Sequence, residues 1–111
     1  MELKTSTRDG ITVIEISGSL DGNTAPKAQE EIMPHAVSGC RLVLDLAKCN
    51  YISSAGLRVL LMIAKHLSAQ EGQYALACVS EEIKDVMDMT GFSSFFKTYD
   101  SVPKAIDAVK A

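Results

Sequence analysis

Hydrophobic and polar residues follow two repeating patterns along this chain. Short β-branched or apolar runs are typical of strands, and the run 42–46 is continuous enough for a strand buried on both faces. Longer segments with apolar residues three or four positions apart are typical of helices. The pattern predicts strands at 2–8, 11–16, 42–46, 74–79 and 96–99, and helices at 25–36, 54–70, 81–90 and 102–109. Strands that alternate with helices predict a mixed α/β sheet.

Turn and capping residues support these boundaries. Asp9-Gly10 is a strong turn signal between the first two strands, and Gly18 is expected to close the second strand. Side-chain oxygens at the start of a helix can accept hydrogen bonds from its unpaired backbone N–H groups. Such N-caps are expected at Asn23 or Thr24, at Ser80, and at Asp100 or Ser101.

Two serines, Ser53 and Ser54, stand where the buried central strand gives way to the longest helix. A serine at this position can cap the helix, and the positive end of the helix dipole also attracts negative charge. A phosphate attached there would therefore occupy a favourable anion site. On local physics alone an ordinary helix cap is the simpler interpretation, and a phosphorylation site is the alternative.

Composition narrows the possible functions. The 111 residues predict a single domain, 1–111, and the net charge of −3 without a run of Lys and Arg argues against nucleic acid and anionic membranes as partners. The three cysteines are widely separated, as expected for reduced thiols. The start of the chain lacks an apolar signal core, and the longest apolar stretch, 59–64, is too short to cross a bilayer. We therefore expect a cytoplasmic protein.

The sequence offers few candidates for catalysis. The serine pair lacks the leading glycine of a Gly-x-Ser-x-Gly nucleophile elbow, and neither histidine is placed as an obvious base. The segment 18–22 contains two glycines but no phosphate-binding motif, so it is expected to be a turn. Asp45 lies near the end of the central strand without a second acidic residue nearby, which favours a hydrogen bond to the following turn over magnesium binding. No metal or cofactor is expected.

Three segments together resemble a known family, the STAS domain of bacterial anti-sigma factor antagonists. The first is Gly-Ser-Leu-Asp at 18–21, followed by Thr-Ala at 24–25. The second is Tyr-Ile-Ser-Ser-Ala-Gly-Leu at 51–57, which resembles the family's switch segment, and the third is the Met-Thr-Gly turn at 89–91. Each is weak alone, but their order and spacing are specific, and the resemblance covers nearly the whole chain.

The resemblance implies an α/β STAS fold. Its mixed sheet would have four to five strands with about four helices, in a single layer packed mainly on one face. The implied activity is binding rather than catalysis: the protein captures an anti-sigma factor, itself an ATP-bound serine kinase, and so frees the sigma factor. Phosphorylation by that kinase would switch binding off, and a metal-dependent PP2C-type serine phosphatase would restore it.

The resemblance also implies site residues. The phosphate acceptor carried over by position is Ser54, with Ser53 as second choice. The implied partner surface comprises Asp21, Asn23, Thr24, Ser53, Ser54, Gly56, Leu57 and Arg58. The switch departs from the family pattern twice, because Ser53 replaces the usual Asp and Ala55 replaces the usual second Ser or Thr. The first change adds a second hydroxyl beside the acceptor, and the second removes one.

Two other functions remain open on the sequence. The first is a STAS subunit that acts as an unphosphorylated scaffold in a larger signalling or transport assembly. The second is a small hydrolase or nucleotide-handling enzyme that uses Asp45, Asp21 and the serine pair.

Overall fold

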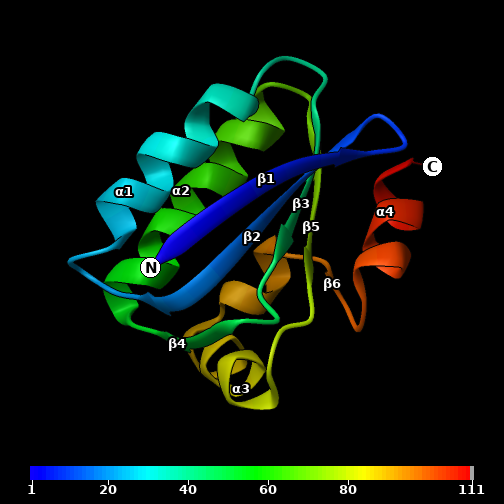
Figure 1. The fold of residues 1–111 in the computed structure, drawn as a ribbon. Coiled ribbons are helices and arrows are strands. Elements are labelled where there is room, and N and C mark those ends of the chain that lie inside the picture. The colour runs from blue at the N-terminus through cyan, green and yellow to red at the C-terminus, as the bar shows by residue number, and fades with distance from the viewer. Residues whose placement is uncertain (111) are drawn as a thin grey trace.

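A computed structural model describes residues 1–110 and has a mixed sheet at its centre (Figure 1). The strands are β1 (Glu2–Arg8), β2 (Ile11–Leu20), β3 (Arg41–Asp45), β4 (Cys49–Ile52), β5 (Gln73–Ala77) and β6 (Thr98–Tyr99). The order in the sheet is β1-β2-β3-β5-β6, with β4 paired to the far end of β2. Only β1 is antiparallel to its neighbour; the other pairings are parallel.

Residues 1–110 also form four α-helices and two short 3₁₀ helices. The α-helices are α1 (Ala25–Ile32), α2 (Ser54–Ala69), α3 (Glu81–Thr90) and α4 (Val102–Lys110), and the 3₁₀ helices are η1 (Met33–His35) and η2 (Phe92–Phe95). The expected caps at Ser80 and Ser101 are present, since each hydroxyl accepts a hydrogen bond from the backbone N–H three residues on. The predicted α/β architecture with a mixed sheet is confirmed.

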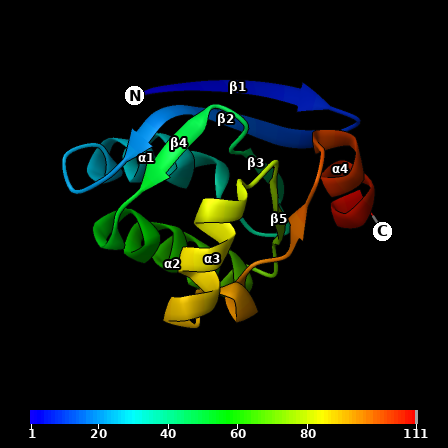
Figure 2. The same cartoon turned by 90° about the horizontal axis from the view of Figure 1, so that it is seen from below.

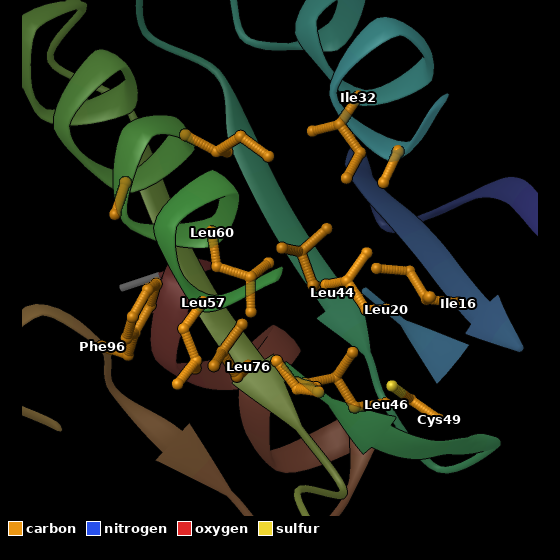
Figure 3. Close-up of a cluster of buried hydrophobic side chains, with 14 of the residues drawn as sticks. Ile16, Leu20, Ile32, Leu44, Leu46, Cys49, Leu57, Leu60, Leu76 and Phe96 are labelled. Atoms are coloured by element: carbon orange, nitrogen blue, oxygen red, sulfur yellow. The ribbon is translucent and has the colours of Figure 1, made fainter. Parts of the chain in front are cut away.

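The helices lie on both faces of the sheet (Figure 1). Helices α1 and α2 cover one face, where Leu57 and Leu60 of α2 lie close to Leu44 and Leu76 of the sheet (Figure 3). Helix α3 adds Ile83 to the same core. Helix α4 covers the opposite face, where a smaller cluster comprises Ile11, Val13, Val43, Ala75, Ala77, Val102, Ala105, Ile106 and Val109. Most helices thus share one face, as predicted, and the last helix makes a second core.

The second strand differs from the sequence prediction. Gly18 was expected to close it, but β2 continues to Leu20 through a register shift between Gly18 and Ser19. Gly18 has φ +94, a conformation that glycine adopts without the penalty of a side chain. The early part of β2 pairs with β3, and the part after the shift pairs with β4. Gly18 therefore allows β2 to pair first with β3 and then with β4.

Strand β4 was not predicted, and it brings the observed number of strands to six. Its four residues, Cys-Asn-Tyr-Ile, are buried only at the two ends, so they form neither an apolar run nor a strict alternation. The prediction of four to five strands was short by this element. Its position matters because β4 leads directly into the serine pair and α2.

Candidate functional site

The turns after β2 and β4 lie side by side at one edge of the molecule (Figure 2). Ser19 pairs with Tyr51 and Leu20 with Ile52, and the Ser53 N–H donates to the Leu20 carbonyl at 2.9 Å. Because the carboxyl ends of parallel strands meet at the same edge, the helices that follow them begin next to each other. The two segments singled out in the sequence, 18–24 and 51–57, thus form one site.

Gly56 allows this close approach. A Cβ atom built on Gly56 would lie 3.0 Å from the Leu20 carbonyl carbon and nearer still to the carbonyl oxygen. The backbone of β2 therefore occupies the space that a side chain would need. By contrast, a Cβ on Gly22 would meet only the Ala55 methyl, at 3.8 Å, which is ordinary van der Waals contact. Of these two glycines at the site, Gly56 is the one that the packing requires.

The two serines have different roles in the structure. Ser53 is the N-cap of α2, and its hydroxyl accepts a hydrogen bond from the Gly56 N–H at 3.2 Å. Ser54 is the first residue of the helix and is exposed. Within residues 1–110 its hydroxyl has no hydrogen-bond partner. The helix-cap interpretation therefore applies to Ser53, whereas the hydroxyl of Ser54 is left available.

Replacing Ser53 with alanine should remove this cap. We expect Ser53→Ala to lower the free energy of unfolding by about 1 kcal/mol, the usual cost of a lost serine cap. Urea denaturation followed by circular dichroism measures the change. Ser54→Ala is the matched control and should change stability much less, because no hydrogen bond from its side chain is lost within the described chain. Equal losses in the two variants would contradict the assignment of the cap.

Asp21 organises the turn between β2 and α1. Its Oδ1 accepts hydrogen bonds from the backbone N–H groups of Asn23, at 2.9 Å, and Thr24, at 3.1 Å. Thr24 occupies the N-cap position of α1, but its side chain makes no cap hydrogen bond to the helix. The Thr24 hydroxyl instead donates to the Ser19 carbonyl at 2.8 Å and accepts from the Asp21 N–H at 2.9 Å. These bonds tie the turn to the end of β2.

The hydrogen bonds that Asp21 accepts also favour its ionised form. The N–H of Asn23, and next that of Thr24, lower the pKa of the Asp21 carboxyl below its ordinary value of 3.8, because both favour the ionised form. Asp21 is therefore an anion at neutral pH. It places a negative charge on the turn beside the two serines.

The lowered pKa predicts a pH dependence. A depressed folded-state pKa stabilises the protein above the unfolded value of 3.8, and that contribution disappears as the pH falls through the folded-state pKa. We expect NMR titration to place the Asp21 carboxyl below 3.8. The stability difference between wild type and Asp21→Asn should be constant at neutral pH and should shrink in acid. A carboxyl that titrates at or above 3.8 would contradict these hydrogen bonds.

The other residues of the expected partner surface divide by exposure. Asn23 and Arg58 are exposed, and Thr24 is partly exposed. Leu57 is only 1% exposed and belongs to the core, so its side chain holds α2 on the sheet and does not reach the surface. Gly56 is likewise buried against β2. Leu57 and Gly56 therefore have a packing role, and their expected contact with a partner stays a prediction.

Tyr51 belongs to the site but was not among the predicted contact residues. It ends the exposed stretch of β4 and is 55% exposed, whereas its neighbour Ile52 is buried. An aromatic ring this exposed is suited to contact with another protein. The sequence placed an aromatic residue at this position of the switch segment. The exposure of Tyr51 depends on strand β4, which the sequence pattern did not predict.

Asp45, the candidate for magnesium binding or catalysis, has a structural role. The Asp45 carboxylate accepts a hydrogen bond from the Ala47 N–H at 3.0 Å, as expected for a residue that orders the following turn. Among residues 1–110 no group of three or more His, Cys, Asp or Glu side chains is arranged to hold a metal ion. In the same part of the chain no helix is both long and apolar enough to cross a membrane.

Comparison with known proteins identifies the family. The model of the STAS domain family matches residues 2–105, which is nearly the whole chain. The chain belongs to the STAS domain family. Among the proteins that it resembles are anti-sigma factor antagonists.

Relatives of this STAS protein cover its full length. BtrV of Bordetella bronchiseptica, a candidate anti-sigma factor antagonist, is 33% identical over 111 residues, which is 99% of this chain and 96% of BtrV. A candidate anti-sigma factor antagonist from Thermotoga maritima has the same fold, with a TM-score of 0.88 at 20% identity over 98% of this chain and 95% of that one. The Bacillus cell fate determinant SpoIIAA in its phosphorylated form has a TM-score of 0.71 at 18% identity, over 97% and 99% of the two chains.

Proposed function

We propose that this STAS protein is a cytoplasmic anti-sigma factor antagonist in a partner-switching system. The unphosphorylated form binds an anti-sigma factor that is also an ATP-bound serine kinase. Phosphorylation at Ser54 releases that partner, and a PP2C-type phosphatase restores binding. The proposal is supported by the similarity to anti-sigma factor antagonists over the full chain.

The observation that carries the proposal is the division of roles between the two serines. A kinase needs an accessible hydroxyl, and Ser54 is exposed with its hydroxyl unengaged within residues 1–110. Ser53 is partly buried, and its hydroxyl is held by the Gly56 N–H. The difference favours Ser54 over Ser53 as the acceptor, and it explains how the helix keeps its cap when Ser54 is modified.

The partner surface of the proposal surrounds Ser54. It comprises the exposed or partly exposed side chains at the two turns, namely Asp21, Asn23, Thr24, Tyr51, Ser53, Ser54 and Arg58. Tyr51, Ser53, Ser54 and Arg58 lie at the end of β4 and the start of α2. The other three lie in the turn between β2 and α1, which the hydrogen bonds of Asp21 and Thr24 hold in place. A surface fixed in this way loses little conformational entropy on binding.

A phosphate at Ser54 should act on binding rather than on folding. It adds about 1.5 to 2 negative charges at neutral pH, and at the first residue of a helix such charge is favourable by roughly 0.3 to 1 kcal/mol. A partner packed over the same residue must instead bury that charge. An unpaired charge in an interface costs on the order of 2 to 5 kcal/mol. The modification therefore separates the partners while the fold persists.

The direct test uses the partner itself. Immobilised unphosphorylated protein should retain its anti-sigma factor kinase from an extract of the cells that encode it, and mass spectrometry identifies the retained protein. Addition of Mg²⁺ and ATP should then release the kinase from wild type but not from Ser54→Ala. Retention of the kinase by wild type after ATP would contradict switching and favour an unphosphorylated scaffold. Turnover of a substrate by the isolated protein that disappears in Ser54→Ala would instead favour an enzyme.

A further inference from the structure

We propose that Arg58 receives the phosphate at Ser54 and holds it against the first turn of α2. The inference rests on the proposed function, because it concerns the phosphorylated form of the same site. It adds a named phosphate-binding side chain to the switch. It also implies that phosphorylation changes the partner surface twice, by adding an anion and by engaging a cation.

The spacing of the two residues brings them together. Ser54 and Arg58 are four residues apart in α2, and side chains at this spacing lie on the same face with their Cβ atoms about 5 to 6 Å apart. Each Cα–Cβ bond of a helix tilts toward its N-terminus, so a long side chain covers the turn before its own residue. The turn before Arg58 is the one that begins at Ser54. Both side chains are exposed to solvent.

Arg58 has no competing anion on its own helix. The segment 54–69 contains no Asp or Glu, and no ion pair of the described chain includes Arg58. The Asp21 carboxylate lies on the neighbouring turn, but its Oδ1 is already held by the N–H groups of Asn23 and Thr24. Within residues 1–110 no ion pair joins the other Asp21 oxygen, Oδ2, to Arg58. A phosphate at Ser54 would therefore meet a guanidinium that holds no carboxylate. Arginine suits the task because its planar group can donate two parallel hydrogen bonds to phosphate oxygens.

The position of Asp21 makes this cation important. The turn that carries Asp21 is joined to the start of α2 by the hydrogen bond from Ser53 to Leu20, so the phosphate would be added beside an existing anion. The two negative charges would repel each other at this edge of the molecule, where the Met1 ammonium already acts on Asp21. Arg58 offsets part of that repulsion. The guanidinium that contacts the partner in the unphosphorylated form is thereby turned toward the phosphate in the phosphorylated form.

The test measures the ionisation of the phosphate itself. Phosphoserine is installed at position 54 during synthesis of the full-length protein, so the result does not depend on any kinase. Phosphorus NMR then follows the second ionisation of the phosphate, whose pKa is near 6 in a free phosphoserine. A nearby guanidinium favours the dianion, so Arg58→Ala should raise this pKa by about 0.15 to 0.4 relative to wild type, the shift that corresponds to an ion pair at this helical spacing.

Lys65→Ala is the matched control. It removes one positive charge from the same exposed face of the same helix, but Lys65 lies eleven residues from Ser54, about 16 Å along the axis and beyond the screening length at physiological salt. The phosphate pKa of Lys65→Ala should equal that of wild type. The charged residues Asp21 and Lys27 of the neighbouring turn and helix are the same in all three proteins, so the comparison isolates Arg58.

The outcomes decide the two proposals separately. A higher phosphate pKa in Arg58→Ala than in both wild type and Lys65→Ala supports the inference. An unchanged pKa, or an equal rise in the two variants, overturns it, because the effect of Arg58 would then be absent or merely that of net charge. Neither result changes whether a kinase modifies Ser54 or whether ATP releases the partner. Circular dichroism confirms that the variants are folded, as expected for an exposed arginine replaced by a strong helix former.

Discussion

Replacement of Ser54 with aspartate is expected to abolish capture of the anti-sigma factor kinase while the protein stays folded. The carboxylate would stand at the first position of α2, where the helix dipole favours negative charge by about 0.3 to 1 kcal/mol. No hydrogen bond within residues 1–110 is lost, because Ser54 makes none through its side chain. Circular dichroism and urea denaturation should therefore resemble those of wild type.

The loss of binding in Ser54→Asp follows from the interface. A charge buried there without a partner costs on the order of 2 to 5 kcal/mol, which is a loss of affinity of roughly thirty-fold to several thousand-fold. Calorimetry with the kinase measures it. Ser54→Ala is the control and should bind close to wild type, because it keeps the surface neutral. Unfolding of Ser54→Asp would contradict the expectation that the fold tolerates a negative charge at this position.

The second large effect is expected at Gly56. Any side chain there must displace the Leu20 backbone of β2, since a Cβ would lie 3.0 Å from the carbonyl carbon of Leu20. Forcing extra atoms into a packed region typically costs about 1 to 3 kcal/mol. This cost outweighs the gain of up to about 1 kcal/mol that alanine brings to a helix over glycine. We expect Gly56→Ala to be less stable than wild type.

Gly22→Ala is the matched control for Gly56→Ala. The two glycines lie at the same site, but a Cβ at Gly22 would meet only the Ala55 methyl at a normal distance of 3.8 Å. Thermal unfolding should show a clear loss for Gly56→Ala and little change for Gly22→Ala. Because Gly56 sets the position of α2 beside β2, Gly56→Ala should also weaken partner binding. A Gly56→Ala protein as stable as wild type would show that β2 and α2 are not packed as described.

Much of the fold follows from local patterns in the sequence. The alternation of strands and helices, the caps at Ser80 and Ser101, and the turn at Asp9-Gly10 each depend on neighbouring residues, so the sequence reveals them directly. The serine pair could be placed at a helix start for the same reason. The resemblance to the STAS family then indicated which surface a partner would use, and the family is confirmed over residues 2–105.

The remaining features depend on contacts between distant segments. Strand β4 is formed because Gly18 allows β2 to shift its register and continue, an event that no pattern within 49–52 announces. The burial of Leu57 depends on the sheet beneath α2. The roles of Ser53 and Ser54 were also open in the sequence, because both positions can cap a helix. The hydrogen bond from the Gly56 N–H to the Ser53 hydroxyl shows that Ser53 is the residue that caps the helix.

The geometry of the site gives a physical meaning to the two residues, Ser53 and Ala55, that differ from the family's switch segment. Ser53, which stands where the family has an Asp, retains a capping oxygen but lacks a carboxylate charge. A phosphate at Ser54 would then have one fewer anion beside it than in a relative with Asp. Ala55 contacts the neighbouring turn near Gly22 and offers no hydroxyl. Of the two serine hydroxyls in this segment, Ser54 carries the one that is exposed and unengaged within the described chain.

Localisation of the phosphate tests the central claim most directly. The captured kinase is incubated with Mg²⁺, ATP and either wild type, Ser54→Ala or Ser53→Ala, and mass spectrometry maps the modified residue. We expect one phosphate on Ser54 of wild type, none on Ser54→Ala, and Ser54 still modified in Ser53→Ala. Phosphate that appears on Ser53, or that persists undiminished in Ser54→Ala, would contradict the assignment of Ser54 as the switch.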